Sequence, residues 1–216
     1  MQLGPGEPPA GPWRVVPLDD LVQLLLTRAG EPRNRPRIVA VDGRQGGGKS
    51  ALTQRLAATV TGAQIVHTDD VAWFHGFFSW AELMADGVLS PLHRGEPVRY
   101  RPPAWVGRAR DGAIVADPSA PVVFVEGVGA ARRELMPFVD AVVWVQSDRS
   151  EADRRGIARD GGTPEARDFW YEWAAEEIPF LIHQRPWERA DVVVCGTPAV
   201  AHGADEVVVA PPFDPR

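Results

Sequence analysis

Gly43-Arg44-Gln45-Gly46-Gly47-Gly48-Lys49-Ser50 matches the pattern G-x-x-x-x-G-K-[ST] at every fixed position. The apolar run Ile38-Val39-Ala40-Val41-Asp42 leads into this stretch, and residues 51–60 that follow it are suited to a helix. Between a strand and a helix, the glycines let successive backbone N–H groups curl around phosphate groups, and the helix N-terminus adds favourable partial charge. The stretch therefore predicts a phosphate-binding loop, or P-loop.

The residues of this loop have distinct expected roles. Lys49 is expected to reach the β- and γ-phosphates of ATP, and the Ser50 hydroxyl to ligate Mg²⁺. Lys49 is the only lysine among 23 basic residues, and such a bias leaves lysine mainly where a planar guanidinium cannot replace a compact ammonium. The residues expected to bind ATP are Gly43, Gly46, Gly47, Gly48, Lys49, Ser50 and Ala51.

Short β-branched runs recur along the chain with helical segments between them. The predicted strands are 38–42, 65–68, 122–126, 142–146 and 192–195, with 207–209 as a candidate edge strand. Nearly continuous apolar runs of this kind are typical of a parallel sheet that helices cover on both faces. We therefore predict a three-layer α/β/α P-loop NTPase fold with a parallel core sheet of about five strands.

The domain organisation follows from changes in composition. Residues 1–12 are dominated by Gly and Pro and predict a disordered N-terminal segment, residues 13–210 a single P-loop domain, and residues 211–216 a short tail. Residues 71–120 break the alternation of strands and helices, which predicts an acceptor-binding insertion between the second and third core strands. Residues 149–165 are predicted to form a lid.

The overall composition restricts the class of partner. A net charge of −6 over 216 residues argues against a general nucleic-acid binder, whose affinity would depend on Lys and Arg. With one cysteine, no apparent secretory leader and no apolar run near the roughly 20 residues that span a bilayer, the expectation is a cytoplasmic protein without a membrane partner. A homo-oligomer is left open.

Carboxylates follow two of the predicted strands. The carboxyl ends of parallel strands meet at one edge of the sheet, where ligands bind. Asp69 is predicted to be the base that takes the proton of an acceptor hydroxyl, with Asp70 in reserve, although either one could simply cap the next segment. Glu126 is predicted to support Mg²⁺ together with Ser50, the alternative being an ordinary acid at a strand end.

Arginines recur at helical spacing within the predicted lid. Arg155 and Arg159 are expected to contact the transferred phosphate, because guanidinium groups suit bidentate contact with phosphate oxygens. Residues 160–163 would be the hinge. The alternative is a solvated basic face that pairs with Glu151 and Asp153.

Aromatic residues crowd the start of the predicted insertion, and aromatic faces can sandwich a flat or apolar acceptor. The alternative is that each of them belongs to the core. The candidate substrate-binding residues are Asp70, Trp73, Trp80, Tyr100 and Arg101.

Taken together, these motifs resemble the uridine kinase and phosphoribulokinase branch of P-loop kinases, over residues 37–197. Asp69-Asp70 stands where that family carries its catalytic Asp, Glu126-Gly127 resembles its strand-end Glu-Gly, and residues 155–160 are similar to its arginine-rich lid. Residues 190–197 resemble the final strand and loop beside adenine. The resemblance implies transfer of the γ-phosphate of ATP to a hydroxyl group of a small molecule, a nucleoside among the candidates.

The acceptor region departs from that family. Pro103-Ala104 stands where pyrimidine-nucleoside kinases have a Tyr-Asp pair. The resemblance therefore carries over the fold and the ATP-binding half, and it does not carry over the acceptor.

P-loops also occur in proteins with other functions. A regulatory GTPase needs an Asn-Lys-x-Asp element, which cannot be built because Asn34 and Lys49 are the only residues of their types. A nucleoside monophosphate kinase stays open, with Arg94, Arg99, Arg101 and Arg108 as candidates for the acceptor phosphate. It ranks lower because Asp69 would repel an anion. A noncatalytic, regulatory ATP-binding module also stays open.

Overall fold

The computed structural model describes residues 1–32 and 34–213. Its main feature is a seven-stranded sheet with the order β1-β9-β8-β7-β2-β6-β3. The strands are β1 (Arg14–Pro17), β2 (Arg37–Gly43), β3 (Gln64–His67), β6 (Val122–Glu126), β7 (Ala141–Gln146), β8 (Val192–Cys195) and β9 (Glu206–Ala210). The five strands from β8 to β3 are parallel, while β9 and β1 extend the sheet in antiparallel pairing.

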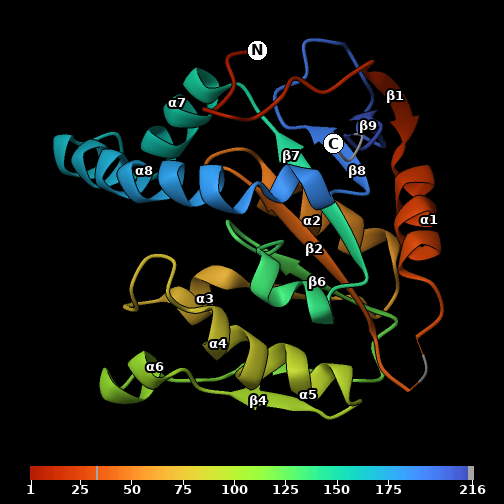
Figure 1. The fold of residues 1–216 in the computed structure, drawn as a ribbon, viewed down its shortest axis with the longest axis vertical. Helices are drawn as coiled ribbons and strands as arrows, with labels where there is room; N and C mark the ends of the chain where they lie inside the picture. The colour runs from red at the N-terminus through yellow and green to blue at the C-terminus, as the bar shows by residue number, and fades with distance from the viewer. Residues whose placement is uncertain (33, 214–216) are drawn as a thin grey trace.

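Helices cover both faces of this sheet (Figure 1). The α-helices are α1 (Leu18–Ala29), α2 (Lys49–Thr59), α3 (Thr68–Ala72), α4 (Ala81–Met84), α5 (Ser90–His93), α6 (Pro103–Gly107), α7 (Arg149–Arg159) and α8 (Pro164–Gln184). A π-helical turn, η1 (Ala85–Leu89), joins α4 to α5, and η2 (Arg133–Phe138) and η3 (Pro186–Arg189) are 3-10 helices. The three-layer α/β/α prediction is confirmed.

Alternate residues of β2 belong to different halves of the core. Val39 and Val41 pack with α1 and α2 on one face, whereas Ile38 and Ala40 pack with the insertion, η2 and α8 on the other. All four side chains are fully buried. A strand that is covered on both faces reads as a continuous apolar run, which is why its position was visible in the sequence.

The predicted insertion lies between the second and third core strands, β3 and β6, and forms the lower part of Figure 1. It begins with α3, continues through the helical run 81–93, and includes a two-stranded antiparallel sheet of β4 (Val98–Tyr100) and β5 (Ile114–Ala116). The elements α4, η1 and α5 follow one another without a break over this run. The insertion packs its own apolar side chains into the same core as the sheet.

The N-terminal segment differs from its prediction. Residues 1–12 were expected to be disordered, but they lie across the end of β7 and the start of α7. The N–H of Gln2 donates to Asp148 Oδ2 at 2.6 Å, and Trp144 Nε1 donates to Glu7 Oε1 at 2.8 Å. Such long-range side-chain partners leave no trace in the local composition, and the prolines lower the entropy lost when the segment is fixed.

The predicted tail, 211–216, falls outside the described residues from 214 onward. Among the described residues, no helix combines the length and apolarity that crossing a bilayer requires.

Candidate active site

The P-loop connects β2 to α2, whose first residue is Lys49. Gly46 and Gly48 have φ angles of 68° and 96°, in the left-handed region that favours glycine. A side chain at Gly46 is also excluded by space, because its Cβ would lie 2.3 Å from the Ala152 oxygen of α7. The loop therefore keeps the tight backbone curvature that a phosphate-binding turn needs.

A cavity of about 380 Å³ lies over this loop. Of the residues predicted to bind ATP, its walls include Gly46, Gly48, Lys49, Ser50 and Ala51. Gly43 and Gly47 shape the turn without lining the cavity.

Lys49 is folded back onto its own loop. Its side chain is largely buried, and Nζ donates a hydrogen bond to the Arg44 main-chain oxygen at 2.8 Å. An ammonium that is held by one neutral carbonyl is available to a more strongly charged partner, because hydrogen bonds to anionic oxygens are roughly twice as strong as neutral ones.

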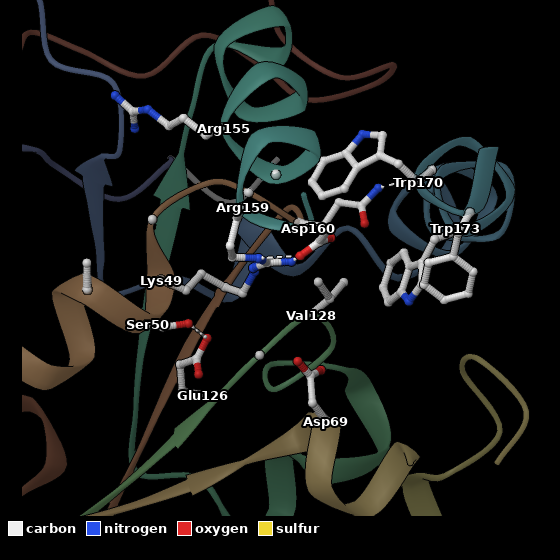
Figure 2. A pocket seen from close by; sticks show the side chains of 17 residues that line it. Lys49, Ser50, Asp69, Glu126, Val128, Arg155, Arg159, Asp160, Trp170 and Trp173 are labelled. Carbon is white, nitrogen blue, oxygen red and sulfur yellow. Dashed lines mark hydrogen bonds and ion pairs between the residues drawn. The ribbon is translucent and has the colours of Figure 1, made fainter. Parts of the chain in front are cut away.

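Glu126 links the P-loop to the neighbouring strand (Figure 2). Ser50 Oγ donates to Glu126 Oε1 at 3.0 Å, and His67 Nδ1 lies 2.7 Å from Glu126 Oε2. Burial alone would raise the pKa of Glu126, but hydrogen bonds from His67 and Ser50 and the charge of Lys49 outweigh it, so the pKa is lowered. Glu126 is therefore held as a carboxylate beside the P-loop hydroxyl.

Ser50 and Glu126 fit a magnesium site that the nucleotide completes. In the part of the chain that the structure describes, no group of three or more His, Cys, Asp or Glu side chains could hold a metal alone. Magnesium prefers one or two protein oxygens together with phosphate oxygens and water. One carboxylate and one hydroxyl at the start of α2 match that preference.

Asp69, in the first turn of α3, points into the cavity from the side opposite Arg159 (Figure 2). Its carboxylate meets solvent, but the cavity walls surround it closely enough that burial raises its pKa. Glu126 raises this pKa further, while Lys49 and Arg159 lower it. An acid whose pKa is raised toward neutrality is better suited to accept a proton from an alcohol.

Asp70 faces the insertion instead. Its Oδ1 accepts a hydrogen bond from Arg110 Nη2 at 2.7 Å, and its main-chain oxygen accepts one from Trp105 Nε1 at 2.8 Å. Asp70 therefore joins α3 to the segment around α6. It lines neither the P-loop cavity nor a second, aromatic cavity described below.

The two predicted lid arginines occupy different places. Arg159 extends into the cavity and pairs with Asp160 at 2.8 Å (Figure 2). Arg155 points away toward the loop after β8, where Nη1 donates to the Gly196 oxygen at 2.9 Å and Nε to Glu151 at 2.8 Å. Both arginines line the cavity, but only the Arg159 side chain points into it without rearrangement.

Helices α7 and α8 form a tightly packed hairpin above the P-loop. Asp148 caps α7 by accepting from the Glu151 N–H, and Thr163 caps α8 by accepting from the Ala166 N–H. Between them, Gly161 and Gly162 have φ angles of 97° and 67°. Within the hinge expected at 160–163, the two glycines are thus in the left-handed region, whereas Asp160 and Thr163 have negative φ angles.

A second cavity, of about 490 Å³, adjoins the first and shares Asp69, Val128, Phe169 and Trp173 with it. Its lining contains seven Trp or Phe side chains, which are Trp73, Phe74, Phe77, Phe78, Trp80, Phe169 and Trp173. Trp73 is partly buried and lies where an acceptor could contact it, whereas Trp80 borders the cavity but is only 1% exposed and belongs to the core, which was the alternative.

Tyr100 and Arg101 lie elsewhere. Tyr100 packs against Gly87 in a separate groove, and Arg101 Nη2 donates to the Arg110 main-chain oxygen at 2.8 Å. Neither residue lines the aromatic cavity, so the prediction that they contact the same acceptor does not match their positions.

A third cavity, of about 190 Å³, lies on the other side of the P-loop. Gly48, Ala51, Cys195 and Gly196 are among its lining residues, and Arg155 separates it from the phosphate cavity. The loop after β8, which the resemblance places beside adenine, therefore forms a wall of a cavity that opens beside the P-loop.

Two buried carboxylates at the P-loop were missed in the sequence. Asp42 is fully buried, and its Oδ1 and Oδ2 accept from the N–H groups of Gly129 and Ala131, 3.0 and 2.9 Å away, in the loop after β6. Glu177 of α8 is also fully buried, and its Oε1 accepts from the Gln45 N–H at 2.6 Å. Burial raises the pKa of each.

Of these two, only Asp42 left a signal in the sequence, because a charged residue that ends a buried apolar strand needs a partner. Glu177 sits on a long helix in which no spacing distinguishes it from the exposed acids around it.

No protein-family model matches the sequence, and no curated protein matches it. Solved structures do. One is of a protein provisionally described as a uridine kinase, from Bacillus stearothermophilus, with a TM-score of 0.52 and 19% identity over 82% of this chain and 96% of that one. Another is provisionally described as a fructose transport system kinase, from Silicibacter sp. TM1040, with a TM-score of 0.52 and 21% identity over 81% and 96%. The chain therefore has the fold of P-loop kinases of this type.

Proposed function

We propose that this chain is an ATP-dependent kinase that transfers the γ-phosphate of ATP to a hydroxyl group of a small molecule. The observation that carries this proposal is the position of Asp69. Its carboxylate belongs both to the cavity over the P-loop and to the aromatic cavity beside it. A base at the junction of two cavities can meet an alcohol in one and a phosphate in the other.

Each residue of the site has a part in this reaction. The P-loop N–H groups and Lys49 bind the phosphates, and Arg159 balances charge over them from α7. Ser50 and Glu126 hold Mg²⁺, which neutralises charge on the phosphate oxygens when it is bound. Asp69 accepts the hydroxyl proton while the acceptor oxygen bonds to the γ-phosphorus, and the bond from that phosphorus to ADP breaks.

The alternative of a nucleoside monophosphate kinase fits less well. Of the arginines considered for an acceptor phosphate, none lines the aromatic cavity. Arg94 is paired with Glu96 at 2.6 Å, and the Arg108 guanidinium lies outside, 3.7 Å from the centre of the Phe74 ring. A noncatalytic ATP-binding module has no need for a second cavity that reaches a carboxylate of the first.

The proposal is tested by measuring ADP formation and ATP binding on the same preparation. With ATP and Mg²⁺, an accepted alcohol should accelerate ADP formation and gain one phosphoryl group in a mass spectrum. Lys49→Ala should weaken ATP binding in calorimetry and abolish the acceptor-dependent rate. If ATP binds and a broad panel of nucleosides, sugars and other alcohols leaves the slow background rate unchanged, the noncatalytic module is the better description.

A further inference from the structure

We infer that the acceptor is an uncharged alcohol whose hydroxyl is carried by an aromatic or similarly flat apolar group, and that it binds in the aromatic cavity beside Asp69. This inference rests on the proposed kinase function and specifies its substrate class. It distinguishes such an alcohol from nucleosides, free sugars and phosphorylated or carboxylated acceptors.

The wall of the aromatic cavity does not suit an anionic acceptor. No Lys or Arg is among the residues that line the aromatic cavity, all of which the structure describes. Two guanidinium groups lie nearby without lining it: Arg110 is paired with Asp70 and lies 3.6 Å from the centre of the Trp105 ring, and Arg108 lies 3.7 Å from the centre of the Phe74 ring. The one carboxylate of the wall, Asp69, would repel an anion. A phosphate or carboxylate group on the acceptor would therefore lose its hydration without gaining a cation.

The aromatic cavity offers few free polar groups to a ligand. Besides Asp69, the polar lining residues are Thr68 and His75, and Trp73 and Trp173 add indole N–H groups. Thr68 is buried against Gly127, and His75 is exposed at the mouth. The indole N–H of Trp80 already donates to the Phe77 oxygen at 2.9 Å. The ring edges of a nucleobase and the several hydroxyls of a sugar would find few partners here, and buried polar groups without partners are costly.

The aromatic side chains of the cavity wall already pack against one another without a ligand. Phe78 stacks on Phe180 with ring centres 4.0 Å apart and an interplanar angle of 11°. Trp173 meets Phe78 edge-on at 5.0 Å. From outside the cavity, Arg132 Nη1 donates to the Phe78 oxygen at 2.7 Å and fixes the loop. A rigid wall loses little entropy on binding, which favours a ligand of matching flat shape.

The size of the cavity agrees with this class. A volume of about 490 Å³ falls within the usual range of small-molecule sites and suits one or two fused rings with a short hydroxymethyl arm. An arm of that kind would direct the hydroxyl toward Asp69, at the junction with the P-loop cavity, while the ring stays among the Trp and Phe side chains.

The test uses the full chain with ATP and Mg²⁺ and the probes 2-naphthalenemethanol, 6-(hydroxymethyl)-2-naphthoate, uridine and fructose. Binding is followed by tryptophan fluorescence and turnover by ADP formation. We expect 2-naphthalenemethanol to have a kcat/KM at least tenfold above the other three probes. Phe77→Ala should raise its KM at least fivefold and leave the KM for ATP unchanged. Tyr171→Ala removes an exposed aromatic of α8 that lines neither cavity and should change neither constant.

The outcomes separate this inference from the kinase proposal. If uridine, fructose or the naphthoate is phosphorylated more efficiently than the neutral naphthyl alcohol, the inference is wrong and the kinase function stands. If the naphthyl alcohol binds, loses affinity in Phe77→Ala and is not phosphorylated, the ligand class is supported and the kinase function is not. If no probe binds and none is phosphorylated, the inference is wrong, and the broad acceptor panel decides the kinase function separately.

Discussion

Asp69 and Asp70 are adjacent in the chain, yet their carboxylates serve different parts of the molecule. Asp69 faces the two cavities that meet beside the P-loop, whereas Asp70 is bonded to Arg110 at 2.7 Å and supports the insertion. The sequence left the choice between them open. Because one carboxylate reaches the cavity and the other does not, the pair supplies its own matched control.

Replacing Asp69 with Asn should lower kcat by about 100- to 10,000-fold, the usual contribution of a general base. ATP affinity measured by calorimetry should stay within a few-fold of the original, because the P-loop is untouched. Asp70→Asn should keep kcat and lower the free energy of unfolding by up to about 1 kcal/mol, since the ion pair with Arg110 is about one-third exposed. The reverse ranking of the two variants in kcat would assign the base to Asp70.

Cys195 offers a direct reading of nucleotide binding, because it is the only cysteine and lines the small cavity with Gly48 and Ala51. If the adenine ring of ATP binds there, ATP at ten times the Kd of the ATP complex should slow alkylation of Cys195 by about tenfold. Burial raises the pKa of this thiol, so the labelling is best done at alkaline pH. Equal labelling rates with and without saturating ATP would locate the base elsewhere.

Glu177 should be critical for the P-loop although it lies on α8. It accepts from the Gln45 N–H and lies 4.0 Å from Arg44, and both charged side chains are almost fully buried. Glu177→Ala should lower the free energy of unfolding by about 3 to 5 kcal/mol, because the Arg44 charge would lose its partner. It should also weaken ATP binding.

The matched control for Glu177→Ala is the double variant Arg44→Met with Glu177→Gln. The amide of Gln keeps an acceptor for the Gln45 N–H, and no charge is left buried. Urea unfolding should find it markedly more stable than Glu177→Ala. Equal losses in the two variants would mean that the ion pair contributes nothing specific.

Glu134 should make stability depend on pH. Arg132 holds it at 2.9 Å, and this hydrogen bond lowers the pKa of Glu134 to about 2. The folded state thus has the lower pKa, so the stabilisation is present above the ordinary value of 4.5 and disappears as the pH falls toward 2. The stability difference between the wild-type protein and Glu134→Gln should therefore shrink over that interval in urea unfolding.

The parts of the site that the sequence revealed are those with a local pattern. The P-loop is a contiguous turn between a strand and a helix, and Glu126 ends a strand whose residues are all buried. Because parallel strands end at one edge of the sheet, the order of strands and motifs along the chain was enough to place these residues beside one another.

The parts that were missed depend on distant pairing. Glu177 meets Gln45 across 132 positions in sequence, and the N-terminal segment reaches β7 across 136 or more. Tyr100 and Arg101 looked suited to an acceptor by residue type alone. Tyr100, paired in β4 with β5, lies in a separate groove, and Arg101 donates to the Arg110 main-chain oxygen. The strand β1 escaped because four residues ending in Pro17 are too few to show a period.

The contact between Gly156 and Trp170 restricts how α7 and α8 can vary. A Cβ at residue 156 would lie 1.8 Å from the Trp170 ring, so the indole occupies the space that a side chain would need. While that ring is in place, neither helix can rotate about its own axis against the other. If α7 and α8 close over a nucleotide, they must therefore move together as a rigid unit. Any homologue with a larger residue at the first position should carry a smaller one at the second.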